Sequence, residues 1–169
     1  MDNDVILKEK DDFLEDKEKV WLGILGAFLL SLIGGGIWCG FLWIDIFRPV
    51  CGIAIVVFAI IGYRVFTKKN STKGLVISIL VSLFTVVLTN YFVLVIEVYY
   101  SFKQWYADGQ YFTKVSFFEA IRGSYQFLSE ETIRAEVLRD LGLGVAFLLL
   151  GAFPFIVDAI KRHRNQPYN

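Results

Sequence analysis

The chain has 169 residues, 56% of them hydrophobic, and its 17 basic and 17 acidic residues give a formal net charge of zero. A balanced charge produces no global field that would attract nucleic acid, so we expect no nucleic-acid partner. The hydrophobic share and the mean hydropathy of +0.54 exceed those of an ordinary soluble domain. Composition therefore indicates an integral membrane protein, with the lipid bilayer as its first partner.

Long apolar runs divide the chain in four places. These runs cover residues 20–43, 49–63, 74–96 and 141–157. An α-helix rises about 1.5 Å per residue, so about 20 apolar residues cross a hydrocarbon core of ~30 Å. The first and third runs satisfy this outright, and the other two reach it when Arg64 and Asp158 lie near helix ends.

We therefore predict an all-α fold, a polytopic membrane protein with four transmembrane helices plus an external amphipathic helix. The predicted spans cover about 20–43, 49–66, 74–98 and 140–160 within a transmembrane domain of residues 20–160. The external segment is 99–139, and charged tails at 1–19 and 161–169 flank the domain.

The distribution of Lys and Arg predicts the orientation. Residues 1–19 contain eight acids, too many for the start of a signal peptide, so we expect the first span to be an uncleaved anchor. Both tails and the loop after the second span together hold 11 of the 17 basic residues (four, three and four). The positive-inside rule then predicts a multi-pass protein of the cell membrane with both termini cytoplasmic.

Small residues recur on one face of the first predicted span. They are Gly23, Ala27, Ser31 and Gly35, four residues apart. In lipid, small residues let helix backbones approach closely, which is a principal route to helix association. We favour packing against another helix of the same chain. A homodimer face, a face for a membrane-protein partner and a hinge at residues 34–36 stay open as alternatives.

Only residues 44–48 separate the first two spans, so we predict an antiparallel hairpin with Pro49 in the first turn of its second helix. Cys39 and Cys51 flank this turn. A disulfide would require an oxidising compartment. Two unpaired buried cysteines are the favoured interpretation.

The third span carries polar side chains at helical spacing. They are Ser78, Ser82, Thr85 and Thr89 on one face, with Asn90 and Glu97 on an adjacent face. An ionisable group at membrane depth is a functional-site hypothesis by default, so Ser82, Thr85, Thr89, Asn90 and Glu97 form a candidate polar or transport site. The favoured alternative is helix packing, with Glu97 paired at the interface to Lys103 or Arg139.

The external segment is rich in aromatic residues and predicts two further helices. Phe118, Ile121, Tyr125 and Leu128 follow helical spacing, which indicates an amphipathic helix near 115–128 that lies on the outer membrane surface or caps the bundle. Ser129 is a suitable N-cap for a helix that runs from about residue 130 into the fourth span, where Pro154 predicts a kink.

Enzymatic chemistry finds no support in the sequence. One histidine, His163, and two cysteines without close spacing do not make a zinc site, and no phosphate-binding or hydrolase motif occurs. We therefore expect no enzyme activity, no catalytic or metal-binding residue and no cofactor.

Three stretches of the sequence resemble those of a known family of membrane proteins. The glycine-rich first span, residues 62–66 (GYRVF) with the lysines that follow, and residues 117–128 (FFEAIRGSYQFL) leading into the fourth span are similar to a family of small four-span membrane proteins of mainly Gram-positive bacteria. The resemblance covers most of residues 20–160 and implies a bacterial protein with four spans and no assigned activity. Some members have an N-terminal zinc ribbon, which residues 1–19 lack because they contain no cysteine.

Two classes of function fit these patterns. The favoured one is a structural or interaction protein, such as an accessory subunit that binds another membrane chain or a second copy of itself. The alternative is a small transporter or channel that acts as an oligomer through the polar face of the third span. Four spans in a monomer leave little room for a water-filled path.

Overall fold

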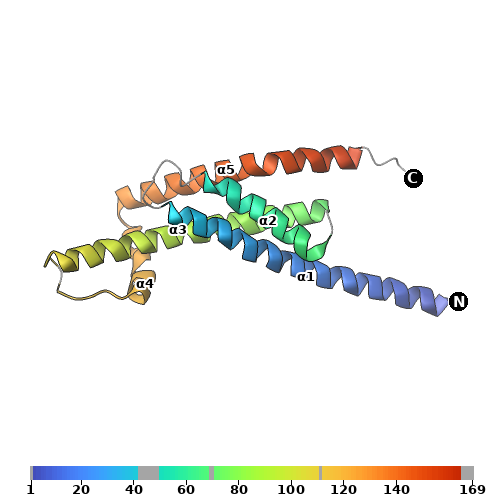
Figure 1. The fold of residues 1–169 in the computed structure, drawn as a ribbon, viewed down its shortest axis with the longest axis horizontal. Helices are drawn as coiled ribbons and strands as arrows, with labels where there is room; N and C mark the ends of the chain where they lie inside the picture. Colours follow the sequence, from blue (N-terminus) through green and yellow to red (C-terminus); the bar gives the residue numbers. More distant parts are fainter. Residues whose placement is uncertain (1, 42–49, 69–70, 111, 165–169) are drawn as a thin grey trace.

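The computed structural model describes residues 2–41, 50–68, 71–110 and 112–164, and it is all-helical over these ranges (Figure 1). The helices are α1 (Asp2–Gly40), α2 (Cys51–Thr67), α3 (Thr72–Ala107), α4 (Phe117–Phe127) and α5 (Glu131–Arg164). Four of them, α1, α2, α3 and α5, extend along the long axis of the molecule, whereas α4 crosses α3. The predicted all-α class is confirmed.

Within the described ranges, three helices are long and apolar enough to cross a membrane. They are the Val20–Gly40 part of α1, all of α3, and the Glu131–Lys161 part of α5. With 17 residues, α2 is about 26 Å long, slightly shorter than a ~30 Å hydrocarbon core. Length and composition thus support three of the four predicted spans directly.

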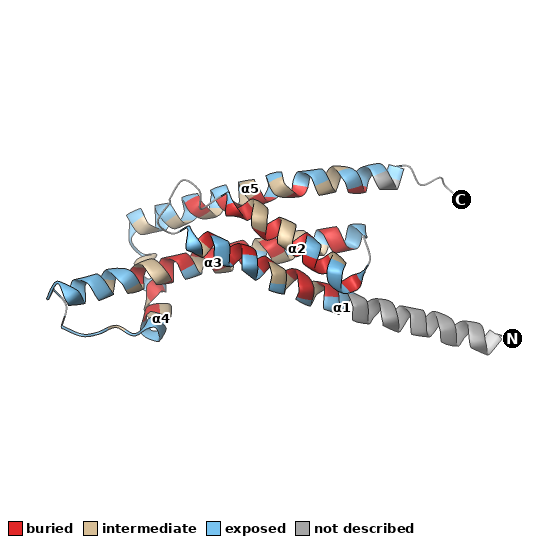
Figure 2. Cartoon of the chain, in the orientation of Figure 1, coloured by how far each residue is buried: buried red, intermediate tan, exposed pale blue. Residues whose placement is uncertain are grey.

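Large apolar side chains cover the outside of the bundle. The most exposed of these on α3 and α5 are Leu80, Phe84, Leu150, Phe153 and Ile160, at 59–64%. Figure 2 shows the buried residues on the faces that the helices turn toward one another and exposed residues on the outer faces. A soluble monomer rarely exposes apolar patches of this extent, so the outer surface suits a hydrocarbon solvent.

The first two helix boundaries differ from the predicted spans. At its N-terminal end α1 begins at Asp2, so the predicted tail continues the first helix, and α1 also runs unbroken through residues 34–36. The second helix begins at Cys51, and Pro49 lies outside the described residues.

The other two long helices also extend beyond their predicted spans. At its C-terminal end α3 reaches Ala107 because no Gly or Pro interrupts it before Gly109, which adopts a φ of +71°. The fifth helix starts at Glu131 and continues through Pro154. Glu130, rather than the predicted Ser129, directly precedes α5, and its carbonyl accepts from the Arg134 N–H over 3.0 Å.

Helix α2 lies inside the bundle, where it packs against α1, α3 and α5. With α1 it forms an antiparallel hairpin, as Figure 1 shows. The core around it includes Trp38, Ile55, Val56, Val86 and Leu148, all at most 1% exposed. This arrangement places the faces of α1 and α3 that carry the predicted sites toward the inside of the molecule.

Candidate functional site

The α1–α2 interface is a seam of backbone contacts made by glycine. A Cβ built on Gly26 would lie 2.7 Å from the Gly62 carbonyl oxygen, and one built on Gly62 would overlap the Gly26 carbonyl oxygen. Near the other end, a Cβ on Gly34 would lie 2.8 Å from the Ile55 Cα. Any side chain at these positions would force the two backbones apart, so glycine fixes the close approach of the helices.

The four predicted small residues of the first span all face other helices of this chain. Gly23 faces the Tyr63 ring, and Ala27 is fully buried against Gly62. Ser31 shares a hydrogen bond of 2.8 Å with the Thr85 hydroxyl of α3. A Cβ on Gly35 would lie 2.5 Å from the Thr89 Oγ1. Gly23 and Ala27 therefore contact α2, whereas Ser31 and Gly35 contact α3.

Tyr63 is a packing residue that sequence reasoning missed. Its ring lies between Gly23 of α1 and Gly74 of α3, since a Cβ on either glycine would overlap it. Only 4% of Tyr63 is exposed. The available signal was a tyrosine directly after Gly62 in a helix whose other residues are mostly apolar.

Trp38 is the second residue missed. It is 1% exposed, and its ring lies directly over Gly144 of α5, where a Cβ would overlap the indole. A Cβ on Gly52 of α2 would in turn overlap the Gly144 carbonyl oxygen. Trp38 stands seven residues after Ser31, hence on the same face of α1, and that spacing was the signal for its burial.

The hydroxyls of α3 are buried and donate within their own helix. Ser78, Ser82 and Thr85 are each 0% exposed. Their hydroxyls donate to backbone carbonyls four residues earlier, over 2.8, 2.7 and 3.0 Å. The carbonyl acceptors satisfy these donors without water or a substrate, so the ladder forms a polar but well-packed interface with α1.

The remaining polar residues of the candidate transport site lie further along α3. Asn90 is 5% exposed, and its Nδ2 donates to the Val137 carbonyl of α5 over 3.2 Å. Glu97 is half-buried two turns later. Arg139, one expected partner of Glu97, bonds Asp140 at 3.2 Å and lies 3.7 Å from Glu136. Asn90 thus ties α3 to α5.

The external helix α4 packs against α3 through a hydrogen bond and contacts between aromatic rings. The Tyr91 hydroxyl donates to the Ile121 carbonyl over 2.6 Å. The buried side of α4 carries the small residues Ala120 and Ser124, at 2% and 0% exposed. Edge-on ring contacts flank it, Tyr99 with Phe117 at 5.6 Å and Phe102 with Phe127 at 6.0 Å.

The predicted apolar face of α4 points partly away from the bundle. Phe118 and Tyr125 are 78% and 60% exposed, because α4 packs through its neighbouring small residues instead. A capping box begins the helix: the Glu119 N–H donates to the Ser116 hydroxyl, and the Ser116 N–H donates to the Glu119 carboxylate over 2.7 Å. That backbone hydrogen bond from Ser116 lowers the pKa of Glu119.

Two glycines of α1 remain open. No described atom lies within 4 Å of a Cβ built on Gly36 or Gly40, and both residues are exposed. They stand four residues apart on α1, next to the exposed Ile33 and Ile37. This pair has the spacing that lets a second helix approach closely in lipid.

The cysteines and acids form no site in the described structure. Neither cysteine forms a disulfide, and Cys39 is partly buried whereas Cys51 is buried. Over the described ranges no three His, Cys, Asp or Glu side chains group closely enough to hold a metal ion.

No family model, curated protein or solved structure matches the chain. The resemblance to small four-span bacterial proteins therefore stays a prediction.

Proposed function

We propose that this protein is a four-span membrane protein that acts as a structural or accessory subunit, binding a further transmembrane helix through Gly36 and Gly40 of α1. The observation that carries the proposal is the contrast among the glycines of α1. Gly23, Gly26, Gly34 and Gly35 contact other helices of this chain. Gly36 and Gly40 meet no described atom and lie among exposed apolar residues. A homodimer and a complex with another membrane chain both satisfy this face.

The fourth span of the proposal is α2. A helix of about 26 Å falls short of the hydrocarbon core by only a few ångström, which local thinning and charged end residues accommodate at modest cost. Arg64 lies in the last turn of α2 and Lys68 at its C-cap, where their side chains reach the headgroups. Packing against α1, α3 and α5 keeps α2 at the depth of the other spans.

In this topology α4 lies along the outer interface. Tyr91 stands within the apolar run of α3, near its outer end, and it holds the middle of α4 at that depth. The crossing of α4 over α3 then sets α4 roughly in the plane of the membrane (Figure 1). The exposed Phe118 and Tyr125 suit the boundary between headgroups and acyl chains.

The transporter alternative receives less support from the geometry. The hydroxyls of Ser82 and Thr85 donate to carbonyls of their own helix, and the Asn90 amide donates to α5. A transport path would need to break these bonds or pass between residues that are at most 5% exposed. We therefore favour packing as the task of this face.

In-membrane photo-crosslinking tests the interaction face. A photoreactive amino acid at Ile33, which is 54% exposed beside Gly36, should give a discrete protein adduct. The same probe at Leu80 of α3, 61% exposed, should label lipid only. Gly36→Ile should abolish the adduct, whereas Gly142→Ile, at an equally open glycine of α5, should leave it unchanged. Absence of any protein adduct at position 33 would refute the proposed interface.

Reporter fusions at Lys69 and Asp108 test the topology. A cytoplasmic signal at Lys69 and an external signal at Asp108 are expected, because α3 separates the two positions. A cytoplasmic signal at Asp108 would overturn the four-span arrangement.

A further inference from the structure

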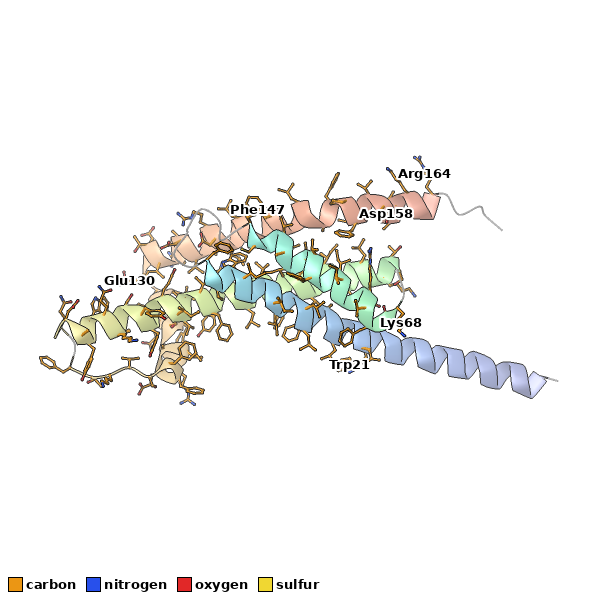
Figure 3. All side chains as sticks on the ribbon, in the orientation of Figure 1. Trp21, Lys68, Glu130, Phe147, Asp158 and Arg164 are labelled. Atoms are coloured by element: carbon orange, nitrogen blue, oxygen red, sulfur yellow. The ribbon has the colours of Figure 1, made fainter. Side chains whose placement is uncertain are left out.

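Basic residues flank the turn where α2 joins α3, although the eight acids of residues 1–19 precede the bundle at the same end (Figure 1). Residues 46–96 contain no Asp or Glu. The described cations of this end are Arg64, Lys68, Lys73, Lys161 and Arg164. Asp158 of α5 lies at the same end (Figure 3), so the described side chains there still carry an excess of positive charge.

Three of these cations flank the α2–α3 turn, and the Arg64 side chain among them is placed by a ring of α5. The Arg64 guanidinium carbon lies 5.3 Å from the centre of the Phe155 ring on α5. Lys68 adopts a φ of +54°, and its N–H donates to the Arg64 carbonyl over 2.8 Å. Lys73 lies in the first turn of α3, where the helix dipole opposes a positive charge. Between described residues, no ion pair includes any of the three.

A small recess opens beside Arg64. Its lining includes Tyr63, Arg64, Ser71 and Gly74. The Ser71 hydroxyl accepts from the Gly74 N–H over 3.0 Å, so its own proton is still available for donation. Arg64 and Ser71 line the recess, and their guanidinium and hydroxyl groups are donors suited to phosphate oxygens.

Apolar surface continues from this basic turn along the bundle. Ile61 and Val65 of α2 are 42% and 60% exposed, within one turn of Arg64. A free anion would use the cations alone, whereas a phospholipid would also cover these side chains with its acyl chains. The combination selects a lipid over a soluble anion.

We propose that the α2–α3 turn binds the phosphate headgroup of an anionic phospholipid through Arg64, Lys68 and Lys73. The acyl chains lie against Ile61 and Val65. The site depends on the membrane embedding of the protein but not on the partner face at Gly36, so the two proposals fail separately.

Native mass spectrometry of the detergent-purified full chain tests the site. With equimolar phosphatidylglycerol and phosphatidylcholine added, the anionic lipid should predominate among the bound species. A basic residue near an anionic surface contributes about fivefold in affinity. Arg64→Gln should therefore reduce phosphatidylglycerol binding about fivefold, and Arg64→Gln with Lys68→Gln and Lys73→Gln should remove the preference.

The matched control changes two cations at the opposite end. Lys103 and Lys114 also lie over aromatic rings, 5.9 Å from Tyr100 and 5.4 Å from Tyr106. Lys103→Gln with Lys114→Gln should leave the lipid preference intact. Equal loss in this control, equal binding of the two lipids by the wild type, or thermal stabilisation by inorganic phosphate as large as that by phosphatidylglycerol would each overturn the proposal.

Discussion

Gly62→Ala, compared with Gly36→Ala, measures how much the glycine seam contributes to stability. A methyl group at Gly62 would meet the Gly26 carbonyl and would lie 3.1 Å from the Ala27 Cα, both of them backbone, so the two helices must separate. Overpacking of this kind typically costs about 1–3 kcal/mol. At Gly36 the same methyl group meets no described atom.

Both substitutions replace glycine by alanine in the same helix class, which stabilises a helix by about 1 kcal/mol in water. That contribution cancels in the comparison, so Gly62→Ala should be about 1–3 kcal/mol less stable than Gly36→Ala. For a chain of this length, 1 kcal/mol shifts the melting temperature by about 2–4 °C, which gives a difference of about 2–12 °C. Thermal unfolding of both variants in the same detergent measures it. Equal melting temperatures would refute close backbone contact at Gly62.

Three further predictions concern single contacts. Gly35→Ile should destabilise the protein by about 1–3 kcal/mol because its side chain meets the Thr89 hydroxyl, whereas Leu29→Ile on the exposed face should be nearly neutral in the same melting assay. Tyr91→Phe removes the bond that holds α4, so hydrogen exchange of the α4 amides should quicken by about fivefold, as expected for the net loss of ~1 kcal/mol, and unchanged exchange would contradict the docking. The folded-state pKa of Glu119 lies below its unfolded value, so its stabilisation of α4 is present above the unfolded pKa and is lost as pH falls through the folded pKa. The protection of the α4 amides, measured as the exchange rate relative to the intrinsic rate at the same pH, should therefore fall on acidification, and Glu119→Gln should weaken this pH dependence.

Apolar runs were sufficient to predict the central parts of the long helices, because length and hydrophobicity are properties of each segment alone, but they did not predict where α1 begins or α3 ends. The hydrophobicity of a segment does not tell which other helix packs against each of its faces. Gly62 and Gly144 are both small residues in apolar helices, yet one meets the α1 backbone and the other accommodates the Trp38 ring. Such pairings depend on how four helices fit together, and no single helix encodes them.

The external helix shows the same limit in a different way. Phe118 and Tyr125 form an apolar face that sequence reasoning found, but Ala120 and Ser124 make the contact with α3. Small residues pack closely when a large aromatic neighbour such as Phe117 fills the side of the contact. A hydrophobicity pattern ranks Phe above Ala and Ser and therefore selects the face that is left for lipid. The Ser116–Glu119 capping box was readable as a Ser-x-x-Glu pattern and was missed.

The unbroken course of α1 has a mechanical consequence. Asp2 to Gly40 is one continuous helix, so the segment before Val20 moves with the apolar part that is long enough to cross a membrane. About 51 Å separate Gly36 from the first helical residue, and a tilt of about 10° at Gly36 displaces that residue by about 9 Å. A lever of this kind turns a small reorientation within the bilayer into a large movement in the aqueous phase.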